Sequence, residues 1–239
     1  MKDLVTGEEY KEAYDTLVLS PGAVPIMPKS IKGIDKKHVF SVRNVVDIVN
    51  IDNYIKENDV KNVAVIGGGF IGVEVMENLT EAGIHVTLVE GSDQVMRFLD
   101  KDMAQIVHKE IMDHGVELIV NDPILSIEDD GVTLKSGKKV KAGAVIMAIG
   151  VRPETSLAAD AGIELGVTGA IKVDKNYRTN VKDIYAVGDA IEVESLLLKK
   201  PTILTMAGPA QREARAVADH MYDRKTANRG VLGSGSVVD

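Results

Sequence analysis

Residues 62–72 of the chain read NVAVIGGGFIG. The apolar run at residues 63–66 suits a strand that is buried on both faces, and Gly67, Gly69 and Gly72 follow it with the spacing G-x-G-x-x-G. In this spacing the first glycine permits a tight turn, the second lets the backbone approach a diphosphate, and the third lets the next helix pack against the strand. The stretch therefore predicts a strand, a turn and a helix whose first N–H groups bind the diphosphate of a dinucleotide.

The sequence after the turn fits the same interpretation. Residues 70–82 have the apolar spacing of a helix, Gly83 can end it in a left-handed conformation, and residues 85–89 read as a second buried strand. Glu90 ends that strand, eighteen residues beyond Gly72, where the ribose-binding acid of a dinucleotide fold belongs. Because a carboxylate repels a 2′-phosphate and the next two residues, Gly91 and Ser92, offer no arginine, NAD is favoured over NADP. A glycine-rich turn without a ligand is the alternative interpretation.

Composition limits the classes of partner and chemistry. The 239 residues carry a formal net charge of −8, and no basic cluster stands out, so we expect neither nucleic acid nor a membrane surface as a partner. No apolar run approaches the ~20 residues that span a bilayer, and the polar N-terminus is unlike a signal peptide, which makes the cytoplasm the expected location. Cysteine is absent, which excludes disulfides and thiol nucleophiles in the chain, and the five histidines lack metal-ligand spacing.

The remaining apolar patterns predict further elements around this βαβ unit. They are a short strand near residues 4–5, a helix within 41–57, a helix over 101–114, a strand over 116–120, a hairpin over 126–134, a strand over 145–149 and a helix over 207–223. In the helix over 101–114 we expect the apolar residues Met103, Ile106, Val107 and Ile111 to point inward. Residues 45–152 thus predict one α/β domain with a parallel sheet.

Two other stretches carry recognisable patterns. Residues 14–23 read YDTLVLSPGA, and residues 179–189 form a strand pattern that ends in Gly188 and Asp189. Together with the dinucleotide motif they resemble the pyridine nucleotide-disulfide oxidoreductases, flavoproteins in which an NAD(P)H domain is inserted into an FAD domain. The first stretch is similar to the family's Y-D-x-L-V-x-A-T-G-A, with Ser20 and Pro21 in place of Ala-Thr, and the second is similar to its second FAD fingerprint. The resemblance covers essentially the whole chain.

The resemblance implies an α/β fold, with a Rossmann-like three-layer NAD-binding domain inserted in a partial FAD-binding domain of the two-dinucleotide-binding flavoprotein type. Residues 1–44 would be the first FAD segment, 45–152 the NAD(H)-binding domain, 153–229 the second FAD segment and 230–239 the start of a C-terminal dimerisation domain. The family's first FAD glycine motif and redox cysteine have no counterpart here, so we expect a fragment whose cysteine lies upstream. Residues 206–212 and 230–234 look most like the branch of coenzyme A disulfide reductase, NADH oxidase and NADH peroxidase.

The resemblance also implies the binding residues. The adenosine diphosphate half of NAD(H) would be anchored by Gly67, Gly69, Gly72 and Glu90, and its nicotinamide half by Phe70, Ile71, Glu74 and Gly150. For FAD in the full-length parent, the implied residues are Ser20, Gly22, Gly188, Asp189 and Ala190, with Asp189 accepting a hydrogen bond from a ribitol hydroxyl. Plainer interpretations stay open: helix-start core residues for Phe70 and Ile71, a solvated charge for Glu74, a strand-ending glycine for Gly150 and a turn residue for Asp189.

The function implied for the parent is hydride transfer from NADH to FAD and on to a cysteine redox centre. The acceptor would be a small-molecule disulfide, oxygen or peroxide, and the parent would be a homodimer. We find no catalytic acid, base, nucleophile or metal ligand in the chain, so we expect it to bind NAD without being catalytically complete. The alternative is a stand-alone NAD-binding or protein-interaction module without redox activity.

Overall fold

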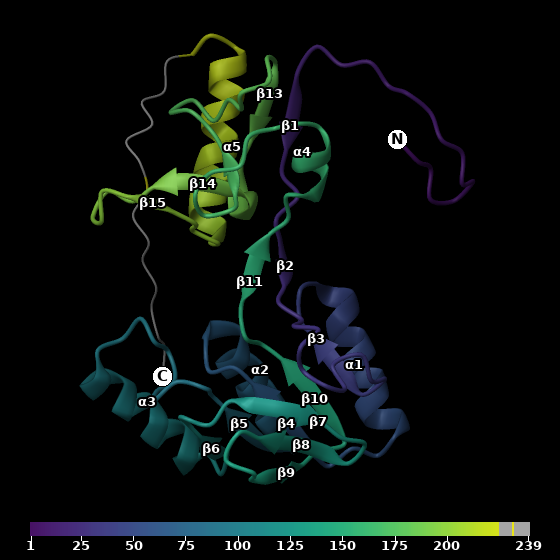
Figure 1. Cartoon of the computed structure of the whole chain (residues 1–239), viewed down its shortest axis with the longest axis vertical. Coiled ribbons are helices and arrows are strands. Elements are labelled where there is room, and N and C mark those ends of the chain that lie inside the picture. The colour runs from purple at the N-terminus through teal and green to yellow at the C-terminus, as the bar shows by residue number, and fades with distance from the viewer. Residues whose placement is uncertain (225–230, 232–239) are drawn as a thin grey trace. The chain divides into compact units, whose positions relative to one another are not determined.

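The computed structural model describes residues 1–224 and residue 231. The chain divides into two compact units, one made of Met1–Val24 with Arg152–Asp239 and the other of Pro25–Val151 (Figure 1). The predicted NAD(H)-binding range, 45–152, lies in the second unit except for its last residue. The predicted start of a dimerisation domain at 230–239 lies outside the described residues, apart from Val231.

Helices and strands alternate between residues 45 and 119, and strands predominate elsewhere. The helices are α1 (Val45–Glu57), α2 (Phe70–Glu81), α3 (Lys101–Asp113), α4 (Ser156–Asp160), the 3₁₀ turn η1 (Gly188–Ala190) and α5 (Ala207–Met221). The strands are β1 (Leu17–Leu19), β2 (Ala23–Pro25), β3 (Val39–Ser41), β4 (Asn62–Ile66), β5 (His85–Val89), β6 (Glu117–Ile119), β7 (Ile124–Ile127), β8 (Gly131–Leu134), β9 (Lys139–Lys141), β10 (Ala144–Met147), β11 (Val151–Pro153), β12 (Ile171–Lys172), β13 (Ile184–Ala186), β14 (Ile191–Glu194) and β15 (Pro201–Thr202).

A five-stranded parallel sheet forms the centre of the unit Pro25–Val151. Its strand order is β3-β10-β4-β5-β6, so β4 pairs with β5 on one side and with β10 on the other. In the register, Ile66 at the end of β4 stands opposite Val89 and Met147, the last residues of its two neighbours. The three strand ends therefore form one edge, and the loops that follow them lie side by side there.

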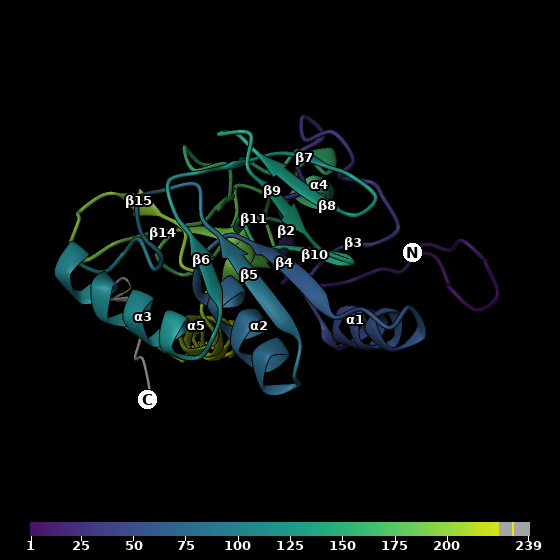
Figure 2. The same cartoon turned by 90° about the horizontal axis from the view of Figure 1, so that it is seen from below.

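Both faces of this sheet are covered, as the continuous apolar runs of its strands predict. Val63 and Val65 belong to a core shared with helices α1, α2 and α3, whereas Ala64 and Ile66 belong to a core shared with the antiparallel sheet β7-β8-β9. Figure 2 shows the helices on one side of β4, β5 and β6 and the strands β7–β9 on the other. The predicted Rossmann-like three-layer arrangement is thus confirmed.

The inward face of α3 agrees only in part with the one predicted: Ile111 is buried and Val107 packs partly buried against the core, as expected, but the other two residues are exposed. Ala104, His108 and Ile111 are its buried residues, while Met103 and Ile106 are 51% and 63% exposed. The buried line has a spacing of four and three residues, and it starts at a small alanine, which lets the helix backbone approach its neighbours. The apolar pattern alone did not identify Ala104 and His108 as part of this face, because the histidine at its centre is polar.

Two further segments depart from a simple reading of their apolar residues. The short strand predicted near residues 4–5 is wrong: Leu4 and Val5 lie in a turn and are 92% and 95% exposed, and only an isolated bridge joins Lys2 to Glu9. Helix α1 forms as predicted, but Ile51 is its buried residue. Four of its other apolar side chains are exposed: Val45, Val46, Ile48 and Val49.

The unit formed by residues 1–24 and 152–239 has its own core. Strands β1 and β13 pair in parallel although they lie far apart in the sequence, with Leu19 opposite Ala186. Helix α5 packs on them and contributes Val217 to a cluster that also contains Leu19, Ile184 and Ala186. This pairing brings residues 14–23 and 179–189, the two stretches that resemble FAD motifs, to the same place.

The face of α3 can be tested with two isoleucines of the same helix. Replacing Ile111, which is 4% exposed, with alanine should lower the free energy of unfolding by about 2–5 kcal/mol, because the substitution leaves a cavity. The same substitution at Ile106, which is 63% exposed, should change it by less than about 0.5 kcal/mol. Urea unfolding measures both, and a larger loss at Ile106 than at Ile111 would contradict the structure.

Candidate nucleotide-binding site

The candidate site lies at the point where the order of strand addition in the parallel sheet reverses. From β4 the chain adds β5 and β6 on one side and then returns to add β10 on the other. In open parallel sheets ligands bind at such a point, outside the carboxyl ends of the strands. The ends are tightly linked here, because the Gly67 N–H donates to Val89 O at 2.8 Å and the Ala148 N–H donates to Ile66 O at 2.7 Å.

Steric contacts explain two of the three motif glycines, and open space marks the third. At Gly67, which has φ +109°, a Cβ would lie 2.4 Å from Ala148 O, and at Gly72 a Cβ would lie 1.8 Å from Gly67 O. A Cβ on Gly69 would meet nothing within 4 Å. The first and third glycines are therefore required by the fold, whereas the space beside the second is available to a ligand.

The start of α2 offers hydrogen-bond donors beside that space. Gly69 is the N-cap residue and carries no side chain that could accept from the first N–H groups, and the first turn of the helix contains no acidic residue. The N–H groups at a helix N-terminus together with the helix dipole favour an anion. The arrangement suits a diphosphate.

Glu90 lies next to the glycine turn, as its position after β5 predicts. Its Oε2 accepts a hydrogen bond from the Gly68 N–H at 2.7 Å, and its Oε1 accepts from the N–H and the hydroxyl of Ser92 at 2.7 and 2.6 Å. These bonds hold the carboxylate at the edge of the turn. Because Oε1 already has two donors and Oε2 has one, Oε2 is the oxygen with capacity for a further donor. A ribose hydroxyl beside the diphosphate could supply that donor.

A segment that the sequence motifs did not single out covers the other side of the turn. The Met96 N–H donates to Gly68 O at 2.7 Å, and a Cβ on Gly68 would lie 2.7 Å from Val95 Cγ1. The Val95 N–H in turn donates to Nε2 of the buried His108 at 3.1 Å. Burial lowers the pKa of His108, which keeps Nε2 free to accept this bond. No motif points to Val95, and its bond to His108 joins two elements that the apolar pattern does not link.

The residues predicted for the nicotinamide half lie around the start of α2 and the end of β10. Phe70 is exposed and stacks on Phe98, with ring centroids 4.5 Å apart, and Phe98 is a neighbour that the sequence did not suggest. Ile71 and Glu74 are exposed on the first turns of α2. Gly150 has φ +117°, a conformation that favours glycine whether or not a ligand is bound.

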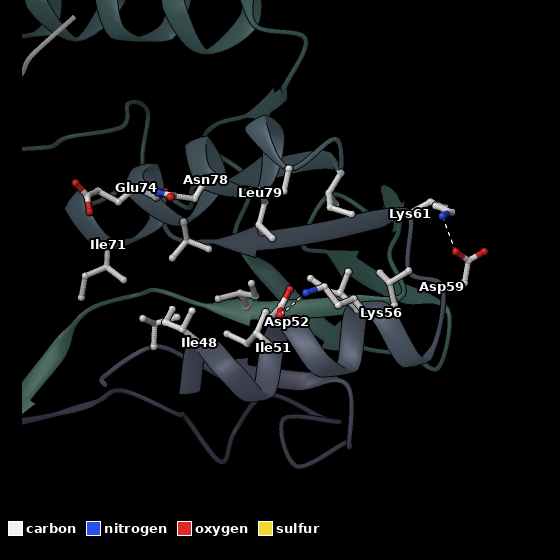
Figure 3. Close-up of a pocket in the computed structure, with 17 residues that line it drawn as sticks. Ile48, Ile51, Asp52, Lys56, Asp59, Lys61, Ile71, Glu74, Asn78 and Leu79 are labelled. Carbon is white, nitrogen blue, oxygen red and sulfur yellow. Dashed lines mark hydrogen bonds and ion pairs between the residues drawn. The ribbon is translucent and has the colours of Figure 1, made fainter. Parts of the chain in front are cut away.

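Ile71 and Glu74 also lie at one end of an apolar groove between α1 and α2, with a volume of about 850 Å³ (Figure 3). The Lys61–Asp59 ion pair marks its other end, and a second ion pair joins Lys56 to Asp52 on α1. Aliphatic residues such as Ile51 and Leu79 line it in between. The groove does not include the glycine turn, so it is distinct from the candidate diphosphate site.

The residues predicted for FAD gather in the other unit, at the carboxyl ends of β1 and β13. The Val187 N–H donates to Leu19 O at 3.0 Å, which sets Ser20 beside the turn that starts at Gly188. Gly188 has φ +79° and begins η1, followed by a half-buried Asp189 and a buried Ala190. Gly22, with φ +76°, has open space around it.

Asp189 is the notable group of this turn. Burial raises the pKa of its carboxyl, and within residues 1–224 no hydrogen bond or ion pair to its side chain is found. A half-buried carboxylate without a protein partner fits a site that receives a hydroxyl donor from a ligand. The residues present are therefore compatible with the ribitol chain of FAD.

Two other kinds of site find no support in the part of the chain that the structure describes. Within residues 1–224 and 231, no group of three or more acidic, histidine or cysteine side chains is arranged to hold a metal ion. None of the helices in the same residues has the length and apolar character needed to cross a membrane.

The fold, with one glycine turn at Gly67 and another at Gly188, is that of the two-dinucleotide-binding flavoproteins. The sequence profile of the pyridine nucleotide-disulphide oxidoreductases matches residues 1–214, and the chain belongs to this family. It is 35% identical to a coenzyme A disulfide reductase from Staphylococcus aureus over 233 residues, which are 97% of this chain and 52% of that protein. The chain thus spans about half the length of this relative.

Solved structures give the same result. The reduced CoADR-RHD of Bacillus anthracis superimposes with a TM-score of 0.95 at 46% identity, covering 98% of this chain and 42% of that one. The water-forming NADH oxidase from Lactobacillus brevis, solved with bound NADH, superimposes with a TM-score of 0.85 at 29% identity, covering 96% and 51%. The predicted family and fold class are confirmed, and so are FAD and NAD(P)H as the cofactors of the family.

The different roles of the motif glycines can be separated by two substitutions. Gly69→Ala should change the free energy of unfolding by no more than about 1 kcal/mol, since the methyl group meets open space, but should weaken NADH binding at least about tenfold. Gly72→Ala should lower the free energy of unfolding by about 3 kcal/mol, because the methyl group would overlap Gly67 O. Urea unfolding and NADH titration distinguish the two variants. Equal NADH affinity for Gly69→Ala and the unmodified chain would refute the assignment of Gly69 to the diphosphate site.

His108 should make the stability depend on pH. Because burial lowers its pKa when the protein is folded, the unfolded state binds more protons below the ordinary histidine pKa of about 6.5. Its contribution should be complete above that pH and should decrease as the pH falls toward the folded-state value. In urea unfolding between pH 7 and pH 5, His108→Gln should show a smaller loss of stability than the parent, since the amide does not titrate. Parallel curves for the two proteins would exclude this role.

Proposed function

We propose that this chain binds NADH in the crevice at the ends of β4, β5 and β10, and that the whole protein uses it as the reductant of an FAD-dependent oxidoreductase. The observation that carries the proposal is the glycine turn, where open space beside Gly69 adjoins the uncapped start of α2 and the carboxylate of Glu90. We take residues 45–152 as the NAD(H)-binding domain. The segments 1–44 and 153–229 are the proposed parts of the FAD-binding domain.

Each residue of the NADH site has a proposed task. The α2 N-terminal N–H groups and the Gly69 backbone bind the diphosphate, and Glu90 accepts from the adenosine ribose. A 2′-phosphate would face the negative charge of Glu90, so NADH is the proposed coenzyme rather than NADPH. Phe70, Ile71, Glu74 and Gly150 surround the proposed nicotinamide end, where their task is to orient the ring.

The proposed FAD residues act by binding and orientation. Asp189 accepts a hydrogen bond from the ribitol chain, while Ser20 and Gly22 leave room at the end of β1 and the backbone of Gly188 and Ala190 faces the ring system. When bound, the two cofactors supply the hydride transfer itself. The chain's own residues contribute no acid, base or nucleophile.

The proposed acceptor is a disulfide, oxygen or peroxide. The named relatives support this range: one is called a coenzyme A disulfide reductase and another a water-forming NADH oxidase. The cysteine redox centre that passes electrons to such an acceptor is not among the 239 residues. We propose a cytoplasmic homodimer as the complete enzyme and no nucleic-acid or membrane partner, and this chain alone as a nucleotide-binding part without turnover.

A module that binds NAD without redox activity is the second candidate. The absence of cysteine from the 239 residues is what favours it. The two candidates share NADH binding and differ in FAD, since only the oxidoreductase requires a flavin at Asp189.

Isothermal titration with NADH tests the coenzyme site, and Glu90→Arg tests its specificity. The unmodified chain should bind NADH more tightly than NADPH. Glu90→Arg should lose about ten- to hundredfold in NADH affinity and shift toward NADPH, because a charged hydrogen-bond acceptor is replaced by a cation. Glu81→Arg, the same charge change at an exposed position near the far end of α2, is the matched control and should behave like the parent. A folded parent that does not bind NADH would overturn the proposal.

A further inference from the structure

Glu213 is an acidic side chain buried where the protein offers it little compensation. It lies on α5 and is 2% exposed, and within residues 1–224 and 231 it is the only fully buried aspartate or glutamate. Burial of a carboxylate is unfavourable unless hydrogen bonds or a counter-ion offset it. Neither the predicted coenzyme site nor the predicted flavin residues include it.

The one hydrogen bond found for Glu213 joins it to the turn at the end of β13. Its Oε2 accepts from the Gly188 N–H at 2.7 Å, and within the described residues its carboxylate forms no ion pair. Burial raises the pKa of Glu213, and repulsion by the carboxylate of Asp189 raises it further, whereas the Gly188 N–H and the positive charge of Arg212 lower it. An alanine at this position would avoid the cost of burying a carboxylate. The benefit of Glu213 should therefore lie in the turn at Gly188, which its hydrogen bond holds.

Gly188 stands directly before Asp189, and its N–H belongs to the peptide that joins Val187 to Gly188. Gly188 has φ +79°, and a Cβ at this position would lie 3.7 Å from the Cβ of Ala210, so α5 covers the turn directly. Without an acceptor, the Gly188 N–H would be left unsatisfied beneath the helix, and the peptide would be free to rotate. The bond to Glu213 fixes the Val187–Gly188 peptide, one residue before Asp189 and its unpartnered carboxylate.

We infer that Glu213 is a positioning residue for FAD, acting through the Gly188 peptide to hold the Asp189 carboxylate in the orientation that accepts the ribitol hydroxyl. This inference rests on the proposed function, because it requires that Asp189 binds FAD. It assigns to α5 a second task besides packing, namely the alignment of a binding group on the neighbouring turn.

The test compares variants that keep or remove the acceptor. Glu213→Gln retains an oxygen that can accept from the Gly188 N–H, whereas Glu213→Leu fills a similar space without one. FAD affinity is measured by fluorescence titration of the flavin-free, full-length protein, and melting temperature is recorded in parallel. Glu213→Gln should stay within about threefold of the parent, and Glu213→Leu should bind FAD at least about tenfold more weakly, which corresponds to about 1.4 kcal/mol.

A double-mutant cycle with Asp189→Ala separates positioning from general stability. If Glu213 acts through Asp189, the double variant Glu213→Leu/Asp189→Ala should bind FAD no more weakly than Asp189→Ala alone. Additive losses would refute the inference, and so would equal FAD affinity for Glu213→Leu and Glu213→Gln. If Glu213→Leu does not fold, Glu213→Gln decides: a folded variant that loses tenfold in FAD affinity contradicts the role of the acceptor, and one with normal affinity supports it. Unchanged affinity of Asp189→Ala would instead overturn the proposed flavin site itself.

Discussion

The parallel pairing of β4 with both β5 and β10 is the constraint on which the proposed coenzyme site depends. Because the register sets Ile66 opposite Val89 and Met147, the three strands end together, and Gly67, Glu90 and Ala148 follow at the same edge. The close contact between Gly67 and Ala148 O is possible only because no Cβ intervenes, and the helix that starts at Gly69 can then point its N-terminus at that edge. Strand register, glycine sterics and helix direction are thus parts of a single arrangement.

The sequence alone predicted the arrangement of β4, α2 and β5, because the signals for it are local. The run of residues 63–66, the spacing of Gly67, Gly69 and Gly72, and the position of Glu90 each follow from contacts between neighbouring elements of one βαβ unit, and the strands and helix form where those signals put them. The same holds for residues 14–23 and 179–189, whose strand patterns were visible. Their parallel pairing across more than 160 residues was not predicted, because no local pattern links the two stretches.

What the sequence could not supply came from contacts between distant segments. Val95 covers Gly68 because His108 on α3 accepts from its N–H, a bond between a loop and a helix that no periodicity encodes. The inward face of α3 was misjudged for the same reason, since Met103 and Ile106 fit an apolar stripe but the packed line runs through Ala104 and His108. Glu213 likewise looks like one more charge on an amphipathic helix until its bond to Gly188 is seen.

The carboxylate of Glu90 is anchored through both oxygens before any coenzyme arrives, by Gly68 on one side and Ser92 on the other. A glutamate that was free to rotate would lose side-chain conformational entropy when a ribose bound, a cost of up to about 1.5–2 kcal/mol. Here that loss accompanies folding instead. The proposed recognition of the sugar would therefore be preorganised, because the Glu90 side chain is already held by the strand-helix junction.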